Sequence, residues 1–167
     1  MIRKIINNNS DCLNNFYIFL DIDGVLNNKA DWSRPYTFNK YNLNTFDNLL
    51  RVLNKQLGRN IHIILTSSWK NSINDKKLFL PLNIILSSYN AIIFEKTDNT
   101  EGKSRQEEIE HYLKQHPEIS EYLILDDDEK LYYNISNKHI FLTDYKAGLT
   151  ADNVKKIIKF VKKGVYV

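Results

Sequence analysis

Short apolar runs alternate along the chain with longer segments of helical spacing. Five runs have the length of strands, and the first is apolar throughout, as in strands buried on both faces; they cover residues 16–20, 61–65, 91–94, 122–125 and 139–142. Between them, apolar residues recur every three or four positions, clearly at 43–57, 109–113 and 154–161 and weakly at 70–80. Strands that alternate with helices predict parallel pairing with right-handed crossovers. We therefore expect an α/β fold, a three-layer α/β/α sandwich around a mostly parallel, Rossmann-like sheet.

Local signals predict where the helices begin and end. Gly58 follows the first helical segment and suits a left-handed C-terminal cap. Residues 104–107 read Ser-Arg-Gln-Glu, a capping box that opens a helix ending before Pro117. Pro35 and Pro81 also fall where we place loops or the ends of elements.

The chain is expected to form a single domain over residues 1–167, since this length is sufficient for one sizeable core. We interpret residues 1–15 as an N-terminal extension. Residues 27–41 follow the first strand and show no clear periodicity, so we interpret them as a small loop insert.

Two carboxylates follow the first strand directly. Asp21 and Asp23 are two positions apart, so they lie on the same side of an extended chain, and Gly24 allows a sharp turn immediately afterwards. Open α/β sheets bind ligands at the carboxyl ends of their strands. Because two like charges this close need a shared cation or proton, we expect a metal site in which one carboxylate is protonated during part of a reaction cycle.

Polar residues also follow the second and fourth strands, and parallel strands would bring them to the same edge. Thr66 and Ser67 end one strand, and Asp126 and Asp127 end the other, with Asp128 left in the following loop or helix start. Carboxylate oxygens of this kind suit Mg²⁺. Two simpler interpretations exist: the hydroxyls could cap the next helix, and the acidic residues could form a solvated capping loop.

Composition and charge change this picture little. Apolar residues make up 43% and charged residues 26%, as in soluble globular proteins, and the net charge of +3 permits a nucleic-acid partner without requiring one. No apolar run is long enough to span a membrane, and the N-terminus does not resemble a signal peptide. The single cysteine, Cys12, suits a reducing compartment, so we expect a cytoplasmic protein. The lysines of the last helix are interpreted as its solvated face, in preference to a nucleic-acid surface.

Taken together, the strand ends resemble the haloacid dehalogenase (HAD) superfamily, and in detail the HAD domain of the "Swiss Army Knife" RNA-repair proteins. The similarity extends from about Tyr17 to the last helix. It rests on Leu-Asp-Ile-Asp-Gly-Val-Leu-Asn at 20–27, Leu-Thr-Ser-Ser-Trp at 65–69, basic-x-x-Glu-Ile at 105–109, Leu-Asp-Asp-Asp at 125–128, and Thr-Asp with Gly-Leu-Thr at 143–150. One departure is Lys70, where that branch often has Arg.

The resemblance implies a role for each strand end. Asp21 would be the nucleophile that forms an aspartyl phosphate, and Asp23 the general acid and base. Mg²⁺ would be held by the Asp21 carboxylate, the Asp23 carbonyl and a carboxylate of the fourth strand, for which Asp127 is the better ligand and Asp126 the supporting residue.

The resemblance also implies groups that bind the substrate phosphate. Thr66, with the backbone N–H of Ser67, would hold a phosphate oxygen. The family places a cation at the start of a helix, and both Lys103 and Arg105 fit this position.

The substrate is expected to be a large phosphorylated molecule. Neither interval that carries a cap domain in the family is long enough for a folded cap, so the site should be open. A nucleic-acid 3′-phosphate end is our first expectation, and Trp32, Tyr36, Phe38 and Trp69 could stack on a base if they are not packed in the core. Nucleotides, phosphoproteins and a phosphotransferase reaction are alternatives.

Two functions from other classes are less favoured. A signalling receiver would carry its phospho-accepting Asp alone on a middle strand, and no Asp ends the middle strand here. A non-catalytic phosphate-binding domain would not need Asp21, Asp23, Thr66 and Asp127 together. The sequence leaves the oligomeric state open.

Overall fold

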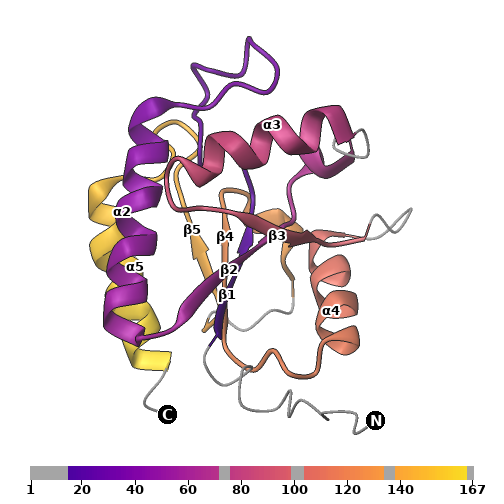
Figure 1. The fold of residues 1–167 in the computed structure, drawn as a ribbon, viewed down its shortest axis with the longest axis vertical. Helices are drawn as coiled ribbons and strands as arrows, with labels where there is room; N and C mark the ends of the chain where they lie inside the picture. The colour runs from indigo at the N-terminus through magenta and orange to yellow at the C-terminus, as the bar shows by residue number, and fades with distance from the viewer. Residues whose placement is uncertain (1–14, 72–75, 99–103, 134–137, 165–167) are drawn as a thin grey trace, which may run out of the picture.

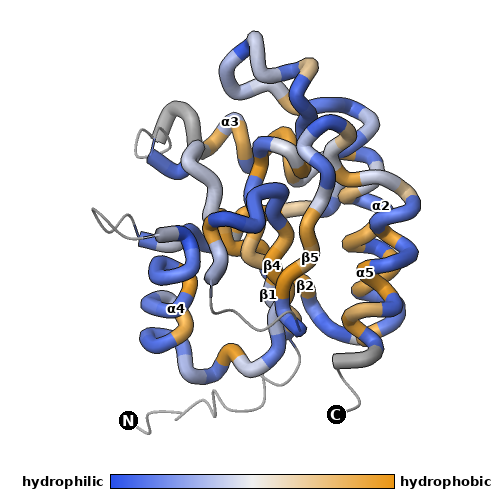
Figure 2. The backbone as a smooth tube through the Cα atoms, turned by 180° about the vertical axis from the view of Figure 1, so that it is seen from behind, coloured by the Kyte–Doolittle hydropathy of each residue, from blue (hydrophilic) through white to orange (hydrophobic). Residues whose placement is uncertain are grey.

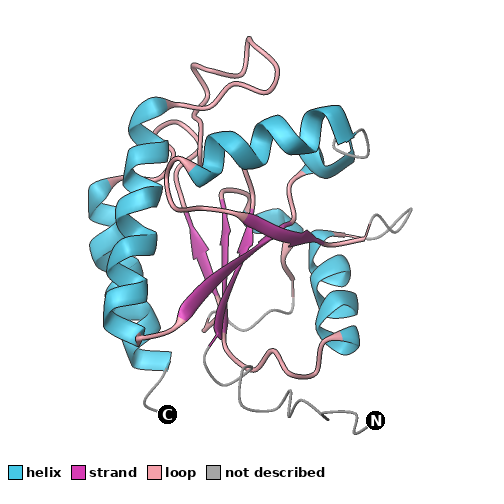
Figure 3. Ribbon diagram, in the orientation of Figure 1, coloured by secondary structure: helices cyan, strands magenta, loops and turns pink. Residues whose placement is uncertain are grey.

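The computed structural model describes residues 15–71, 76–98, 104–133 and 138–164. Within these ranges the chain forms a five-stranded sheet between helical layers, and every strand pair is parallel, which confirms the predicted sandwich (Figures 1 and 3). The strands are β1 (Asn15–Leu20), β2 (Asn60–Leu65), β3 (Ile93–Lys96), β4 (Tyr122–Asp126) and β5 (Ile140–Leu142). The helices are α2 (Lys40–Leu57), α3 (Lys76–Ser87), α4 (Arg105–Gln115) and α5 (Ala151–Gly164), with short 3₁₀ helices η1 (Ser68–Asn71) and η2 (Glu129–Leu131).

The order of the strands in the sheet is β3-β2-β1-β4-β5. The chain therefore moves outward from β1 through β2 to β3, then returns to place β4 on the other side of β1. This reversal creates a topological switch point between β1 and β4. In open α/β sheets, the crevice outside the strand ends at such a point is where ligands bind.

Successive residues of β1 belong to the two opposite faces of the sheet. Ile18 and Leu20 pack in the cluster that includes apolar residues of α2, α3 and α5, whereas Tyr17 and Phe19 pack in the cluster that includes α4. Figure 2 shows the strands as the hydrophobic centre between the helices. The continuous apolar run therefore has the cause predicted for it, since both faces of β1 are covered.

The predicted helix ends are confirmed where local signals were strong. Gly58 caps α2 in a left-handed conformation with φ 63°, and the Asn39 side chain caps its other end by accepting hydrogen bonds from two backbone N–H groups. Ser104 opens α4 with the complete capping box. The apolar stripe of α5 is buried at Val154 and Ile157, and its lysines are exposed wherever they are described.

The weak pattern between β2 and β3 was interpreted incorrectly. Instead of one helix over 70–80, the chain forms η1 and then α3, and Pro81 lies inside α3 rather than at its end. Burial of Leu82 and Leu86 in the core stabilises the helix beyond Pro81. This burial offsets the one backbone hydrogen bond that the proline removes. β3 also lies two residues later than predicted, because an edge strand can carry the polar pair Glu95 and Lys96.

The segment between β1 and α2 lies beyond the carboxyl ends of the strands, at the top of Figure 1. It contains only turns and irregular backbone from residue 21 to residue 39. Across the ranges that the structure describes, no helix has the length and apolar character needed to cross a membrane.

Candidate active site

In-register pairing brings three strand ends to one level of the sheet. Leu20, at the end of β1, is flanked by Leu65 of β2 and Leu125 of β4. The pairing of the strands extends one residue further through two backbone hydrogen bonds of 2.9 Å. Asp21 N–H donates to Leu125 O, and Thr66 N–H donates to Leu20 O. The residues that follow these leucines are the polar ones: Asp21, Thr66 and Asp126. Asp21 and Asp126 lie at the switch point between β1 and β4, and Thr66 lies on the β2 side of Asp21.

Asp21 is a buried carboxylate that faces a fixed cation. Only 5% of the residue is exposed, and its Oδ1 accepts a hydrogen bond of 2.6 Å from Nη1 of Arg105, the first residue of α4. Burial raises the pKa of Asp21 to about 7; Arg105 opposes the rise, Asp126 adds to it, and a hydrogen bond from the Ser67 side chain opposes it. The charge of Asp21 therefore depends on how much positive charge lies beside it.

Arg105 bridges two carboxylates, since the same Nη1 also donates to Oδ2 of Asp126 at 3.0 Å. Burial alone would lower the pKa of Arg105, but the Asp21 and Asp126 charges raise it above its ordinary value. The guanidinium therefore keeps its charge. The alternative cation, Lys103, lies outside the described residues.

The Asp126 side chain is saturated with hydrogen bonds and only 1% of the residue is exposed. Oδ2 accepts from Arg105 and from the hydroxyl of Tyr132 at 2.6 Å, and Oδ1 accepts from the backbone N–H groups of Asp127 and Asp128 at 2.7 and 3.0 Å. Burial and the nearby Asp126 charge raise the pKa of Tyr132, so its hydroxyl remains a donor. Asp126 therefore orients Arg105 rather than offering a free oxygen.

Asp127 is the more accessible carboxylate of the pair. It is half-buried, and burial together with the Asp126 charge raises its pKa to about 6. Its Oδ2 occupies the space beside Gly24, where a Cβ would lie only 2.3 Å away. Gly24 has φ +74° and so suits glycine for a second reason. Asp128 is exposed and caps η2, as predicted.

Two donors fix the side chain of Asp23. Asn27 Nδ2 donates to Oδ1 at 2.7 Å, and the indole N–H of Trp69 donates to Oδ2 at 2.9 Å. Asn27 is itself 2% exposed, and its Oδ1 accepts from Gly24 N–H and from the indole N–H of Trp32, both at 3.0 Å. A network of short polar contacts thus connects Asp23 to the 27–41 segment.

Thr66 carries a buried side-chain hydroxyl. The residue is 1% exposed, and within the described part of the chain its Oγ1 has no hydrogen-bond partner. Buried polar groups are nearly always paired, so an exception of this kind needs an explanation. Thr66 lies beside Asp21 at the strand ends, so a ligand bound there could accept a hydrogen bond from this hydroxyl.

Lys70, where the family branch often has Arg, is a buried and ion-paired cation. It is 3% exposed, and its ammonium forms an ion pair with Glu108 and donates to Thr97 Oγ1 at 2.8 Å. Burial lowers the pKa of Lys70, and Glu108 partly restores it. The residue therefore joins η1 to α4, which carries Arg105.

Three carboxylates can approach a common cation. Oxygens of Asp21, Asp126 and Asp127 all lie within 4.8 Å of one another. Among the described residues, Arg105 is a cation that contacts two of them, Asp21 and Asp126. Burial is the main cause of the raised pKa values of Asp21 and Asp127, the Asp126 charge adds to both, and a divalent cation would offset this negative charge. The residues present therefore fit a metal ion with oxygen ligands.

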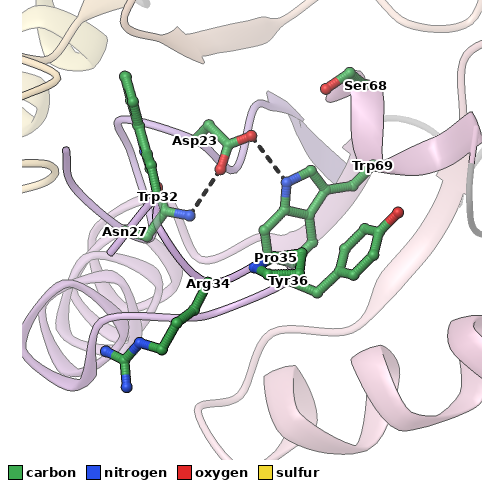
Figure 4. A pocket seen from close by; sticks show the side chains of 8 residues that line it. All are labelled: Asp23, Asn27, Trp32, Arg34, Pro35, Tyr36, Ser68 and Trp69. Atoms are coloured by element: carbon green, nitrogen blue, oxygen red, sulfur yellow. Dashed lines mark hydrogen bonds between the residues drawn. The ribbon is translucent and has the colours of Figure 1, made fainter. Parts of the chain in front are cut away.

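A pocket of about 590 Å³ opens beside Asp23 (Figure 4). Asp23 and Trp69 lie between Trp32 on one side and Tyr36 on the other. Trp69 is 7% exposed and packs against Phe38, whereas Trp32 and Tyr36 are 43% and 48% exposed. The complete lining is Asp23, Asn27, Trp32, Arg34, Pro35, Tyr36, Ser68 and Trp69.

Sequence reasoning missed the residues that support the site. Tyr132 gave no signal, because nothing in the sequence indicates that it reaches Asp126 from six residues away. Asn27 was noted only as part of a motif, although its four hydrogen bonds organise the turn after β1. Burial of Lys70 with Glu108 depends on how η1 meets α4, which one-dimensional patterns do not reveal.

The comparison with protein families decides what kind of domain carries this site. The family described as "HAD domain in Swiss Army Knife RNA repair proteins" matches residues 17–154, which is most of the chain. The chain belongs to this family. Neither a curated protein nor a solved structure matches it. Membership implies a phosphatase-type hydrolase, and the matched range includes every strand end of the HAD site described above.

Proposed function

We propose that the protein is a Mg²⁺-dependent phosphomonoesterase that works through Asp21. The observation that carries this proposal is the buried Asp21 carboxylate, held by Arg105 at the switch point. Beside it lies the Thr66 hydroxyl, which has no hydrogen-bond partner among the described residues. A carboxylate, a cation and a spare donor are what an in-line displacement at phosphorus requires.

In the first step, an Asp21 oxygen attacks the phosphorus of the ester. The P–O bond to the leaving group breaks, its electron pair goes to the leaving oxygen, and Asp23 supplies the proton that this oxygen needs. In the second step, water attacks the phosphorus of the aspartyl phosphate, Asp23 takes a proton from it, and the Asp21 carboxylate leaves with release of inorganic phosphate. Asp23 suits both proton transfers because Asn27 and Trp69 hold it at the pocket.

Arg105 and Thr66 would hold the transferred group. Arg105 already contacts the attacking carboxylate, so its guanidinium would reduce the repulsion between Asp21 and the phosphate oxygens. The Thr66 hydroxyl would donate to one of these oxygens and thereby gain the partner it lacks. The Ser67 backbone N–H is the second donor proposed for this position.

The ligands proposed for Mg²⁺ are the Asp21 and Asp127 carboxylates and the Asp23 carbonyl. Asp126 would support them, because its oxygens already accept hydrogen bonds from four donors. When bound, the ion would neutralise negative charge between the carboxylates and the phosphate. The family in general uses Mg²⁺, in agreement with the excess of acidic groups here.

The proposed substrate is a nucleic-acid end with a 3′-phosphate. The 27–41 segment takes the place of a cap and offers exposed aromatic rings, with an exposed Arg34 at the far side of the same pocket, which suits a nucleotide at the end of a strand (Figure 4). The name of the family supports the same substrate class.

A Mg²⁺-dependent screen of the purified protein tests the proposal. The substrates are oligonucleotides with 3′- or 5′-phosphates, nucleotides, phosphopeptides and p-nitrophenyl phosphate, with Asp21→Asn as the inactive control. We expect release of phosphate that requires Mg²⁺ and Asp21 and is most efficient on 3′-phosphate ends. Preference for a nucleotide or phosphopeptide would overturn the substrate class, and full activity of a folded Asp21→Asn protein would overturn the mechanism.

A further inference from the structure

Trp32 is an exposed aromatic residue that the protein holds in a fixed position. Although 43% of it is exposed, its indole N–H donates to Asn27 Oδ1 at 3.0 Å. One side of its ring stacks on Tyr145, with ring centroids 5.8 Å apart and planes inclined by 25°. An exposed side chain without a role rarely has both a buried hydrogen-bond partner and a stacking partner. This arrangement pre-organises a flat apolar surface at the edge of the pocket.

Tyr36 lines the opposite side of the same pocket and is also held in an unusual state. Its backbone has φ 53°, a left-handed conformation that is unfavourable for a bulky side chain. Its ring meets Trp69 edge-to-face at 5.1 Å, so it remains near Asp23 while 48% of it is exposed. Strain of this kind is found where a surface is shaped for a ligand.

Trp32 is also connected to the proposed chemistry. Asn27 accepts from Trp32 with one atom and donates to Asp23 with another, so two hydrogen bonds join the indole to the proposed general acid. The pocket volume of about 590 Å³ falls in the range of small-molecule sites, roughly 300–1,000 Å³. A group that lies against Trp32 is thus adjacent to the place where a phosphate would react.

Cations lie beside the stacked rings of Trp32 and Tyr145. The ammonium groups of Lys29 and Lys146 each lie 5.7 Å from the centre of the Tyr145 ring. Arg34, whose side chain is 71% exposed, lines the pocket itself. Aromatic faces with cations beside them match a single-stranded nucleic acid, whose bases stack and whose phosphates need cations.

From these observations we infer that the pocket is a base-binding subsite, in which Trp32 is the stacking platform for the terminal base of a 3′-phosphorylated strand. Lys29 and Lys146 then face the phosphodiester of the preceding nucleotide. The inference rests on the proposed function and extends it, because it makes recognition depend on the base next to the reacting phosphate and not on the phosphate alone.

Removing the base from the substrate tests the inference without changing the protein. We compare kcat/KM on a 3′-phosphorylated oligonucleotide with that on the same strand carrying an abasic terminal sugar. The abasic strand should be about tenfold poorer or worse, since stacking of one base on an aromatic ring is commonly worth that much. Equal efficiency on both strands would overturn the inference and leave the phosphatase assignment intact.

Trp32→Ala completes the cycle. Its kcat/KM should fall about tenfold on the base-bearing strand. On the abasic strand its kcat/KM should change little, because the base that stacks on the missing ring is already absent. Trp32→Phe retains a ring but loses the hydrogen bond to Asn27, so substantial retention of the base preference would identify stacking as the cause. Tyr41→Ala is the matched control, since Tyr41 is an exposed aromatic residue outside the pocket and its removal should leave the preference unchanged. Equal losses on both strands in Trp32→Ala would instead assign Trp32 to the support of Asn27.

Binding to the Asp21→Asn protein separates the two proposals if no substrate is hydrolysed. The base-bearing strand should bind about tenfold more tightly than the abasic one, and equal binding would overturn the inference whatever the activity.

The salt dependence of binding tests the two lysines. Lys29→Ala/Lys146→Ala should reduce the slope of log affinity against log salt by roughly 0.7 for each lost phosphate contact. The exposed pair on α5, Lys155→Ala/Lys159→Ala, should leave this slope unchanged, and a change equal to that of the first pair would remove the assigned role of Lys29 and Lys146.

Discussion

Arg105 joins two buried carboxylates, Asp21 and Asp126, through one nitrogen atom. Asp126 is satisfied by four donors, whereas Thr66 has a hydroxyl with no partner among the described residues. At the scale of the residue, saturated groups hold the site in place and unsaturated groups are free to bind. This distinction predicts which substitutions alter stability and which alter activity.

Thr66→Val should reduce activity without reducing stability. Its hydroxyl makes no hydrogen bond to any residue that the structure describes, so the free energy of unfolding should change by less than about 1 kcal/mol. The value of kcat/KM should fall about tenfold or more, because a donor to the phosphate is lost.

Thr45→Val is the matched control for Thr66→Val. The Thr45 hydroxyl is also buried but donates to the Tyr41 carbonyl at 2.9 Å, so its loss should lower the free energy of unfolding by about 1 kcal/mol and spare activity. Urea titrations and steady-state kinetics on both variants make the comparison. A Thr66→Val protein with full kcat/KM would contradict the role of Thr66.

Asp127→Asn should stabilise the metal-free protein at pH 7. The pKa of Asp127 is raised to about 6 from the ordinary 3.8, so the folded state holds a proton there that the unfolded state has already lost. Wild-type stability therefore decreases as pH rises between these two values, and the advantage of the variant should be present above pH 6 and absent near pH 4.

With Mg²⁺ present, the wild type should become more stable than Asp127→Asn. The ion stabilises a folded state that binds it, and the variant lacks one of the ligands. Urea titrations at both pH values, with and without Mg²⁺, measure these effects. Asp128→Asn, in the exposed cap of η2, is the control and should follow the wild type. If Asp128→Asn shows the effect instead, the metal ligand after β4 has been assigned to the wrong residue.

At the scale of the element, the turn after β1 and the turn after β4 share one small space. Gly24 provides it, since a Cβ there would lie 2.3 Å from Asp127 Oδ2. Gly24→Ala should therefore displace Asp127 and raise the Mg²⁺ concentration needed for half-maximal activity by roughly tenfold.

Gly58→Ala separates this effect from backbone strain. Gly58 has a similar left-handed φ of 63°, and in the described part of the chain no atom beyond its chain neighbours lies within 4 Å of its would-be Cβ. Alanine should therefore cost about 1 kcal/mol of stability and leave the Mg²⁺ requirement unchanged. Metal titrations of the two variants, with urea unfolding in parallel, give the answer. Equal Mg²⁺ requirements would show that Asp127 adapts to the new methyl group.

Elements with strong local signals could be predicted from the sequence, and elements determined by packing could not. β1 was found because five apolar residues need cover on both faces, and α4 because its capping box lies within four residues. α3 was placed too early, because its position depends on Leu82 and Leu86 meeting the sheet. The same limit applies to the site, where the strand-end residues were found and Tyr132 was missed.

At the scale of the whole molecule, topology makes one edge of the sheet the place for chemistry. The order β3-β2-β1-β4-β5 brings residues more than a hundred positions apart to one level, and it leaves the 27–41 segment beyond that edge. The proposed catalytic groups thus lie on strand ends that neighbouring strands fix, and exposed aromatic groups lie on the adjoining loop. The first set would determine the reaction and the second the substrate.

The central claim is that Asp21 carries the phosphoryl group, and trapping that intermediate tests it most directly. Asp23→Asn removes the base proposed for the second step and also the acid proposed for the first, so the trapping substrate needs a leaving group that departs without a proton. This variant, mixed with Mg²⁺ and p-nitrophenyl phosphate labelled in its phosphate, should accumulate labelled protein. After an acid quench, the label should map to the peptide that contains Asp21 and be released by hydroxylamine, as an acyl phosphate is. Release of labelled phosphate with no protein-bound label in either wild type or variant, or label on a different residue, would contradict the account.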